Sequence, residues 1–184
     1  MPSDNLCVFE SIDGQITPAV QQAIALTQST GSHLTLISAV RLAHAPSSMV
    51  ASSLVAGALK VANDKAREAA RAAASIAQDA ARIAGANCTV MLHEDTLTGI
   101  ADWLGRRARL ADMTIVVRPV NVVDAQQAFF EDALFASGRP VLVASPDSCS
   151  KSIKRMAIAW NGSRVSARAM GDAIALSRRP HRLT

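Results

Sequence analysis

Five short apolar segments alternate with four stretches of helical periodicity, and this alternation constrains the fold more than any other feature. Apolar runs of this length are typical of buried strands, and a helix between two strands implies a parallel pair with a right-handed crossover. The sequence therefore predicts a doubly wound α/β fold, in which helices flank a parallel sheet. The predicted strands are residues 6–12, 33–40, 88–92, 113–117 and 141–144.

The helices of this predicted domain are bounded by recognisable signals. Thr17-Pro18 supplies an N-cap residue and a proline for the first turn, and Gly31 is a typical helix terminator. The longest helix is rich in alanine and scatters its charges evenly, which favours a helix that covers a sheet over a coiled coil. The predicted helices are residues 17–30, 54–84, 98–110 and 124–135.

The opening pattern is repeated near the end of the sequence. An apolar strand at residues 155–160 is followed by Asn161-Gly162-Ser163 and by a helix at residues 165–176. An internal repeat of this kind predicts the start of a second unit. We therefore expect an α/β domain over residues 1–146, a polar linker at 147–152, and the first strand and helix of an incomplete second unit over 153–184.

The positive net charge is confined to the end of the chain. Residues 1–150 carry 11 Lys and Arg against 14 Asp and Glu, whereas residues 151–184 carry 8 Lys and Arg against Asp172 alone. A basic segment can bind nucleic acid, but these charges lie on an amphipathic helix pattern without interleaved aromatic residues. The sequence favours a solvated helix face over nucleic-acid binding.

Metal and redox sites are not indicated. Cys7, Cys88 and Cys149 are widely spaced, form no CxxC pair and have no histidine at ligand spacing, so we expect no metal and a reducing compartment. The amino terminus lacks the basic start and apolar stretch of a signal peptide, and no apolar run has the length of a membrane span. A cytoplasmic protein without a membrane partner is expected.

The sequence also gives little indication of a catalytic site. His93, Glu94 and Asp95 form the one acid–base cluster in the sequence, and no nucleophile with a partner base is visible. Trp103 is interpreted as a core residue, with ligand stacking as the alternative. We therefore expect no catalytic residues and no enzyme activity.

Several segments, in their order and spacing, resemble the universal stress protein family. They are the strand ending in Ile12-Asp13-Gly14, the segment Thr30-Gly31-Ser32-His33-Leu34-Thr35-Leu36, the strand Ala111–Val117, and Gly138-Arg139-Pro140-Val141-Leu142-Val143. Ala159-Trp160-Asn161-Gly162-Ser163 is similar to the start of the second half of bacterial tandem members. The resemblance implies the strand order 3-2-1-4-5 and a homodimer formed through the last strand, Val141–Ala144.

The resemblance also implies adenine nucleotide binding, with ATP or AMP as the ligand. Family members use an acidic residue after the first strand, which matches Asp13, and backbone groups at the end of the second strand, which match Val40. From its sequence position alone, Asp13 can equally be a turn or cap residue.

The sequence departs from the family in the phosphate-binding loop. The family's glycine pattern falls on Arg118-Pro119-Val120-Asn121 and on Gln127-Ala128, and no glycine lies between Gly105 and Gly138. Pro119 has no backbone N–H, and Arg118 would supply a positive charge instead. Three functions remain open: a stress-response module that binds adenine nucleotide weakly, a nucleotide-independent dimerisation scaffold, and an enzyme of a related adenine-nucleotide fold.

Overall fold

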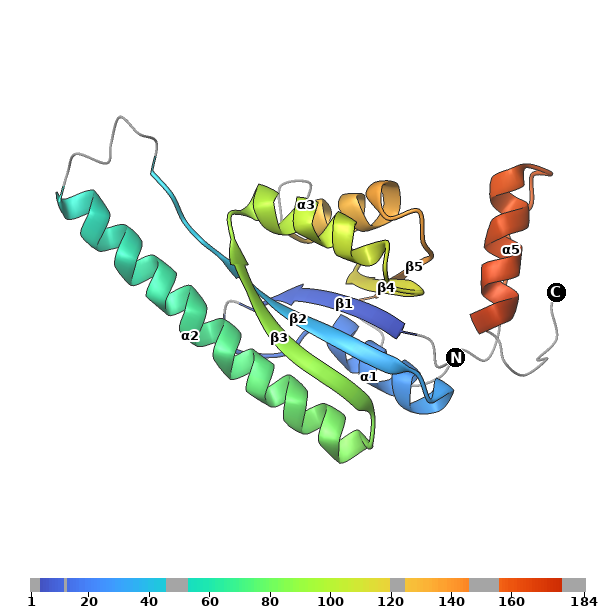
Figure 1. Cartoon of the computed structure of the whole chain (residues 1–184), viewed down its shortest axis with the longest axis horizontal. Helices are drawn as coiled ribbons and strands as arrows, with labels where there is room; N and C mark the ends of the chain where they lie inside the picture. Colours follow the sequence, from blue (N-terminus) through green and yellow to red (C-terminus); the bar gives the residue numbers. More distant parts are fainter. Residues whose placement is uncertain (1–3, 12, 46–52, 120–124, 146–155, 177–184) are drawn as a thin grey trace. The chain divides into compact units, whose positions relative to one another are not determined.

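The computed structural model describes residues 4–11, 13–45, 53–119, 125–145 and 156–176, and the chain divides into two compact units, Met1–Cys149 and Ser150–Thr184. The first unit contains a five-stranded parallel sheet of order β3-β2-β1-β4-β5 (Figure 1). The predicted fold class and strand order are therefore confirmed. The strands are β1 (Asp4–Glu10), β2 (His33–Arg41), β3 (Asn87–Asp95), β4 (Met113–Val117) and β5 (Val141–Ala144).

Helices cover both faces of the sheet. On one face lie α1 (Pro18–Thr30) and α2 (Ser53–Ala84), and on the other α3 (Leu97–Ala108) and α4 (Ala125–Glu131), the last continued by the π-helix η2 (Asp132–Ala136). Helix α1 begins after Thr17 and ends at Gly31, which adopts the left-handed conformation (φ 64°), as its sequence signals predict.

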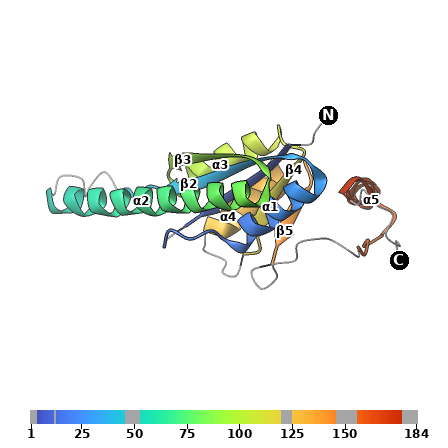
Figure 2. The same cartoon turned by 90° about the horizontal axis from the view of Figure 1, so that it is seen from below.

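Helix α2 runs well past the end of the sheet (Figure 2). Its C-terminal part packs on β2 and β3 through buried alanines, whereas no side chain from Leu54 to Ala69 is buried. Where it does pack, Ser38 of β2 donates a hydrogen bond to the carbonyl of Ala70 at 2.9 Å. The buried alanines are Ala70, Ala73, Ala74, Ala77 and Ala81.

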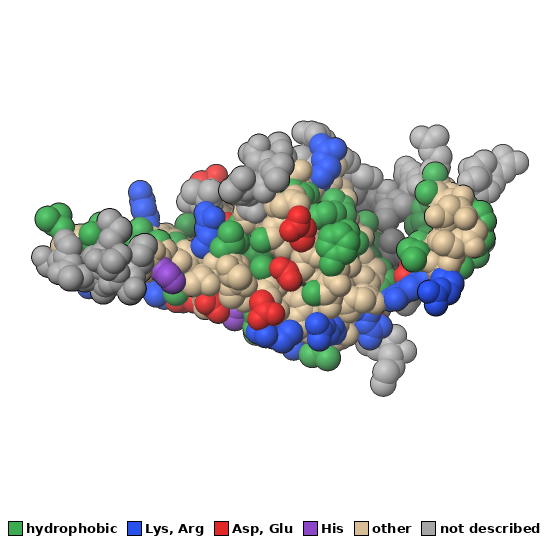
Figure 3. All heavy atoms as spheres, turned by 90° about the horizontal axis from the view of Figure 1, so that it is seen from above, with side chains coloured by type: hydrophobic (Ala, Val, Ile, Leu, Met, Phe, Trp, Pro, Cys, Tyr) green, Lys and Arg blue, Asp and Glu red, His purple; other side chains and the backbone are tan. Residues whose placement is uncertain are grey.

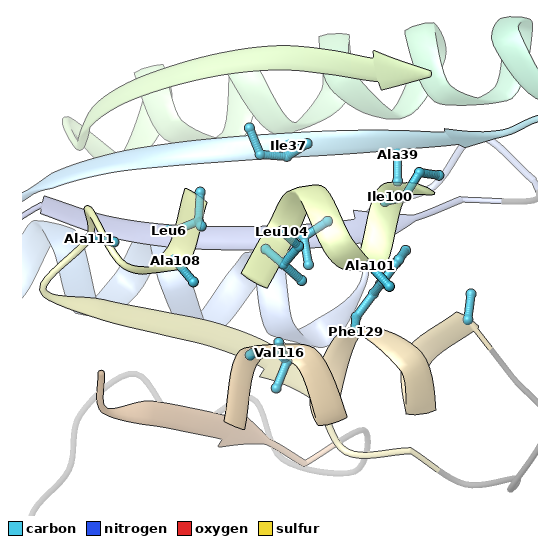
Figure 4. Close-up of a cluster of buried hydrophobic side chains, with 13 residues drawn as sticks. Leu6, Ile37, Ala39, Ile100, Ala101, Leu104, Ala108, Ala111, Val116 and Phe129 are labelled. Atoms are coloured by element: carbon cyan, nitrogen blue, oxygen red, sulfur yellow. The ribbon is translucent and has the colours of Figure 1, made fainter. Parts of the chain in front are cut away.

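The core between the sheet and helices α3 and α4 is shown in Figure 4. Leu104 of α3 is fully buried there, whereas Leu110, just after the same helix, is 73 % exposed. Gly105 allows α3 to approach η2, because a Cβ atom at this position would lie 3.0 Å from the Cβ of Ala136. The core residues of this layer are Leu6, Val8, Ile37, Ala39, Ile100, Ala101, Leu104, Ala108, Ala111, Val116, Ala125, Phe129 and Ala133.

The end of the fourth predicted helix differs from expectation. Residues 125–131 form an α-helix, but the turn then widens into the π-helix Asp132–Ala136.

The side chain of Asp132 lies in an acidic environment, because burial and the neighbouring carboxylates of Asp102 and Glu131 raise its pKa. Acidic side chains lie among exposed apolar ones on the face seen in Figure 3.

The second unit contains helix α5 (Arg164–Leu176), close to the predicted bounds. Met156–Trp160 forms no strand among the described residues, so the predicted strand at 155–160 is not present there. The physical reason is that a strand is held by hydrogen bonds from a neighbouring strand, and none pairs with this segment in the described part of the chain. The predicted linker at 147–152, Arg155 and Cys149 lie outside the described residues.

Cys7 and Cys88 are free thiols inside the first unit. Burial raises the pKa of Cys88 to about 11, and burial together with the neighbouring Cys88 raises the pKa of Cys7 still further. Both side chains are therefore protonated near neutral pH and behave as small apolar groups.

We predict that Leu104→Ala lowers the free energy of unfolding by about 2–5 kcal/mol, because it removes a fully buried side chain and leaves a cavity. Leu110→Ala, a matched change at an exposed position, should alter it by less than about 0.5 kcal/mol. Urea unfolding followed by circular dichroism measures both. Equal effects of the two substitutions would contradict the packing described for α3.

Candidate functional site

The order of the strands marks the carboxyl ends of β1 and β4 as a candidate site, and we call this side of the sheet its carboxyl edge. Chain connection reverses direction between β1 and β4, and in open α/β sheets ligands bind outside the carboxyl ends of the strands at such a point. A small crevice of about 10 Å³ lies there, enough for a single water molecule. It is lined by Val8, Phe9, Glu10, Thr17, Val116, Val117, Gln126 and Phe129.

Asp13 is exposed in the turn that follows β1. Its Oδ1 accepts hydrogen bonds from the backbone amide of Gln15 at 3.1 Å and from the hydroxyl of Ser11 at 3.4 Å. One carboxylate oxygen therefore holds the turn, as the turn-residue interpretation of the sequence requires. No hydrogen bond to Oδ2 is formed within the described part of the chain, which leaves that oxygen available to a ligand.

Gly14 fixes this turn against helix α2. Its φ of 79° lies in the left-handed region, and a Cβ atom would lie 3.2 Å from the Cβ of Ala72. The turn can therefore pack closely on α2 only with glycine at this position. The close packing places the neighbouring Asp13 at the carboxyl edge of the sheet.

Val40 lies near the end of β2, with its side chain buried to 1 % exposure. The amide of Leu42 donates to the carbonyl of Asp95 in β3 at 2.8 Å. Peptide groups alternate between the two neighbours along a parallel strand, so the backbone groups of Val40 also face β3, and those of Ala39 and Arg41 face β1.

Arg41 and Glu10 form an ion pair that the sequence analysis missed. Nε of Arg41 lies 3.0 Å from Oε1 of Glu10, and the Glu10 side chain is only 14 % exposed. Glu10 lies within the first predicted strand and Arg41 directly follows the second, but their contact depends on the register that pairs Glu10 with Ala39. The pair places charge beside the crevice, where Glu10 is also a lining residue.

Arg118 follows β4 at the same edge and is exposed. Its backbone amide donates to the carbonyl of Ala144 at 2.8 Å and so extends the pairing of β4 with β5. Pro119 provides no N–H to a phosphate, and Val120 and Asn121 lie outside the described residues. Asp13, Val40 and Arg118 thus all lie at the carboxyl edge, at the ends of the adjacent strands β1, β2 and β4.

The predicted third strand ended at residue 92, but β3 continues to Asp95, so His93, Glu94 and Asp95 are its last three residues, and each has its own contacts. The His93 ring stacks on Trp103 with centroids 3.9 Å apart and 15° between the planes, so Trp103 contacts His93 in the interface between β3 and α3. Glu94 pairs with Arg67 at 2.9 Å, and Asp95 accepts a hydrogen bond from the amide of Thr96 at 2.7 Å. The three side chains therefore contact different groups.

Two further kinds of feature are absent from the described part of the chain. Within the described ranges, no group of three His, Cys, Asp or Glu side chains could hold a metal ion. No helix formed by those residues combines the length and the apolar character that crossing a membrane requires.

The His93 environment predicts a pH dependence of stability. Burial lowers the pKa of His93 from 6.5, although the nearby Asp95 acts in the opposite direction. The folded state then binds a proton less readily than the unfolded chain, so the free energy of unfolding should fall as the pH drops below about 6.5. Urea unfolding between pH 5 and 8, a window of about three units around the ordinary histidine pKa, should show a smaller fall in His93→Gln. An unchanged pH profile in that variant would exclude His93 as the cause.

Comparisons with known proteins identify the fold. No family model matches the sequence, and neither does any curated protein. Among solved structures, universal stress protein UspA from Lactobacillus plantarum aligns with a TM-score of 0.59 and 14 % identity, over 78 % of this chain and 99 % of that chain. A universal stress protein family member from Burkholderia pseudomallei aligns with a TM-score of 0.51 and 22 % identity, over 78 % of this chain and 96 % of that chain. The chain therefore has the fold of the universal stress proteins.

Proposed function

We propose that the chain is a non-catalytic regulatory module of the universal stress protein type that binds adenine nucleotide weakly at the carboxyl edge of its sheet. The observation that carries this proposal is the Asp13 carboxylate, exposed at the strand-order reversal with one oxygen holding the turn and the other available. The structural similarity to universal stress proteins supports the location of the site through the shared fold.

The chemistry of the edge fits the nucleoside part of such a ligand. A carboxylate oxygen can accept hydrogen bonds from ribose hydroxyls, a role that Asp13 can fill from the turn after β1. The backbone groups of Val40 face β3, whereas those of Arg41 face the β1 side and can pair with the edge of a base, and the Arg118 guanidinium provides positive charge for phosphate. The proposed site needs no metal ion held by the protein itself.

We expect weak affinity for the nucleotide because of two features, the loop that would contact the phosphates and the small size of the crevice. Pro119 offers no amide donor to a phosphate, and the crevice between β1 and β4 has room for only about one water molecule, with a volume near 10 Å³. The base and ribose would therefore bind on the exposed edge near Asp13. Within the described residues, the phosphates would rely on charge more than on backbone N–H groups.

We predict that calorimetric titration with ATP and magnesium gives saturable binding that Asp13→Asn weakens by about tenfold or more. The asparagine retains an oxygen for the turn but removes the charge that strengthens hydrogen bonds to ribose. Asp79→Asn is the matched control, because Asp79 is an exposed carboxylate on α2 that pairs with Arg82. No binding by the wild type, or equal affinity in Asp13→Asn, would contradict the nucleotide site.

A second proposal concerns assembly. We propose a homodimer that forms through β5, because β5 is at one edge of the sheet and pairs with β4 alone among the described strands. Val143 in this strand is 40 % exposed. An apolar strand edge readily pairs with another chain, and a two-fold dimer would bury this one. Such a dimer would persist as a scaffold even without nucleotide.

We predict that Val143→Lys weakens self-association at least about tenfold in sedimentation velocity, because it introduces a charge at the exposed strand edge. Met91→Lys is the control at the opposite edge of the sheet, since Met91 in β3 is also 40 % exposed. A monomeric wild type would exclude the dimer. Stronger disruption by Met91→Lys would place the interface on β3 instead.

A further inference from the structure

Three side chains at the amino edge of the sheet form a hydrogen-bonded relay. Nδ1 of His33 lies 2.8 Å from Oδ1 of Asp4, and Nε2 of the same ring lies 3.0 Å from the hydroxyl oxygen of Thr89. The three residues come from β1, β2 and β3, so only the parallel register brings them together. These residues lie near the amino ends of the strands, whereas Asp13 lies at the carboxyl ends.

The carboxylate determines how the neutral histidine is protonated. An ionised Asp4 can only accept a hydrogen bond, so Nδ1 of His33 must carry the ring proton. Nε2 then presents its lone pair and can only accept, which means that the Thr89 hydroxyl donates to it. A hydroxyl that donates to an imidazole, which in turn donates to a carboxylate, is the arrangement that activates a nucleophile.

The relay is both held in place and accessible. The backbone amide of Asp4 donates to the Asp112 carboxylate at 2.8 Å, and the amide of Asp112 donates back to the carbonyl of Asp4 at 2.8 Å. These two bonds fix the start of β1. The side chains of Asp4 and His33 are 48 % and 31 % exposed, and Thr89 lies on an exposed part of the edge strand β3.

A cleft of about 60 Å³ reaches the relay at Asp4, the one relay residue among those that line it. Asp4 lines it, as does Thr35, which is the register partner of Thr89 in the sheet. The cleft also includes the side chain of Arg107 from α3, whose guanidinium is suited to stabilising a negatively charged oxygen. Apolar lining from Leu6, Leu110 and Ala111 suits a short acyl chain.

We propose that Thr89 is a self-acylation site, with His33 as its general base and Asp4 as the residue that positions His33. The substrate class is a small activated acyl ester. Oγ1 of Thr89 attacks the carbonyl carbon while its proton moves to Nε2 of His33; the bond to the leaving oxygen then breaks, and that oxygen takes the proton. The products are an O-acyl threonine and an alcohol or phenol, with no oxidant or reductant involved.

The acylation site is separate from the proposed nucleotide site, because its residues lie near the amino ends of the strands, whereas Asp13 lies at the carboxyl ends. The reaction modifies the chain once and requires no turnover. It therefore assigns a covalent modification site to a module that is otherwise proposed to be non-catalytic. The feature that separates Thr89 from other exposed threonines is the imidazole bonded to its hydroxyl.

The test uses the full chain and p-nitrophenyl acetate, with release of p-nitrophenolate followed optically and the acetylated residue located by peptide mass mapping. We expect one acetyl group on Thr89, retained in Thr89→Ser and lost in Thr89→Val. His33→Gln should slow acetylation of residue 89 by about a hundredfold, the contribution typical of a general base. Asp4→Asn should slow it as well while leaving the thermal unfolding of the chain unchanged.

Thr98→Val is the matched control, because Thr98 is an exposed threonine with no histidine bonded to it in the described structure. This variant should acetylate Thr89 at the wild-type rate. Acetyl groups found only on lysines or the amino terminus of the wild type would overturn the proposal. So would equal labelling of Thr89 in a folded His33→Gln variant. Peptide mass mapping of the wild-type chain alone shows whether acetylation is confined to lysines and the amino terminus.

Discussion

The parallel pairing of β1 with β2 is the interaction on which the rest of the first unit depends. Seven register pairs join these strands, from Asp4 opposite His33 to Glu10 opposite Ala39. The central β1 is covered on both faces, so its middle residues Leu6–Phe9 are apolar and buried, and its parallel neighbours require helical crossovers. The same register sets both edges of the sheet: the relay of Asp4 and His33 at one end, and the ion pair of Glu10 and Arg41 at the other.

Local sequence signals predicted the elements that local interactions determine. Thr17-Pro18 and Gly31 gave the bounds of α1 because a cap, a proline and a left-handed terminator act within one turn of the helix. The π-helix after Glu131 was not predictable in this way. It lies against Gly105 of α3, and that approach is a property of tertiary packing. The segment 155–160 shows the same limit, since its apolar pattern suits a strand but pairing requires a partner.

The candidate sites were predictable to different degrees. Asp13 was identified through the resemblance to the universal stress proteins, whose members carry an acidic residue after the first strand, and the structure adds that one of its oxygens holds the turn. His33 and Thr89 are 56 positions apart and belong to no short motif, so their contact emerges only from the sheet register. Trp103 was assigned to the core with ligand stacking as the alternative, and its contact with His93 gives the ring a protein partner.

Helix α2 has a consequence for the dynamics of the fold. Its 32 residues span about 48 Å, whereas the nine-residue strands beneath it span only about 30 Å. The buried alanines begin at Ala70, so the preceding turns are held by their own backbone bonds and by a few polar contacts such as that of Asn63 with Ala43. Opening of those turns would expose little apolar surface. Amide hydrogen exchange along this single helix should therefore be graded, fast before Ala70 through local fraying and slow beyond it, where exchange requires the sheet to open.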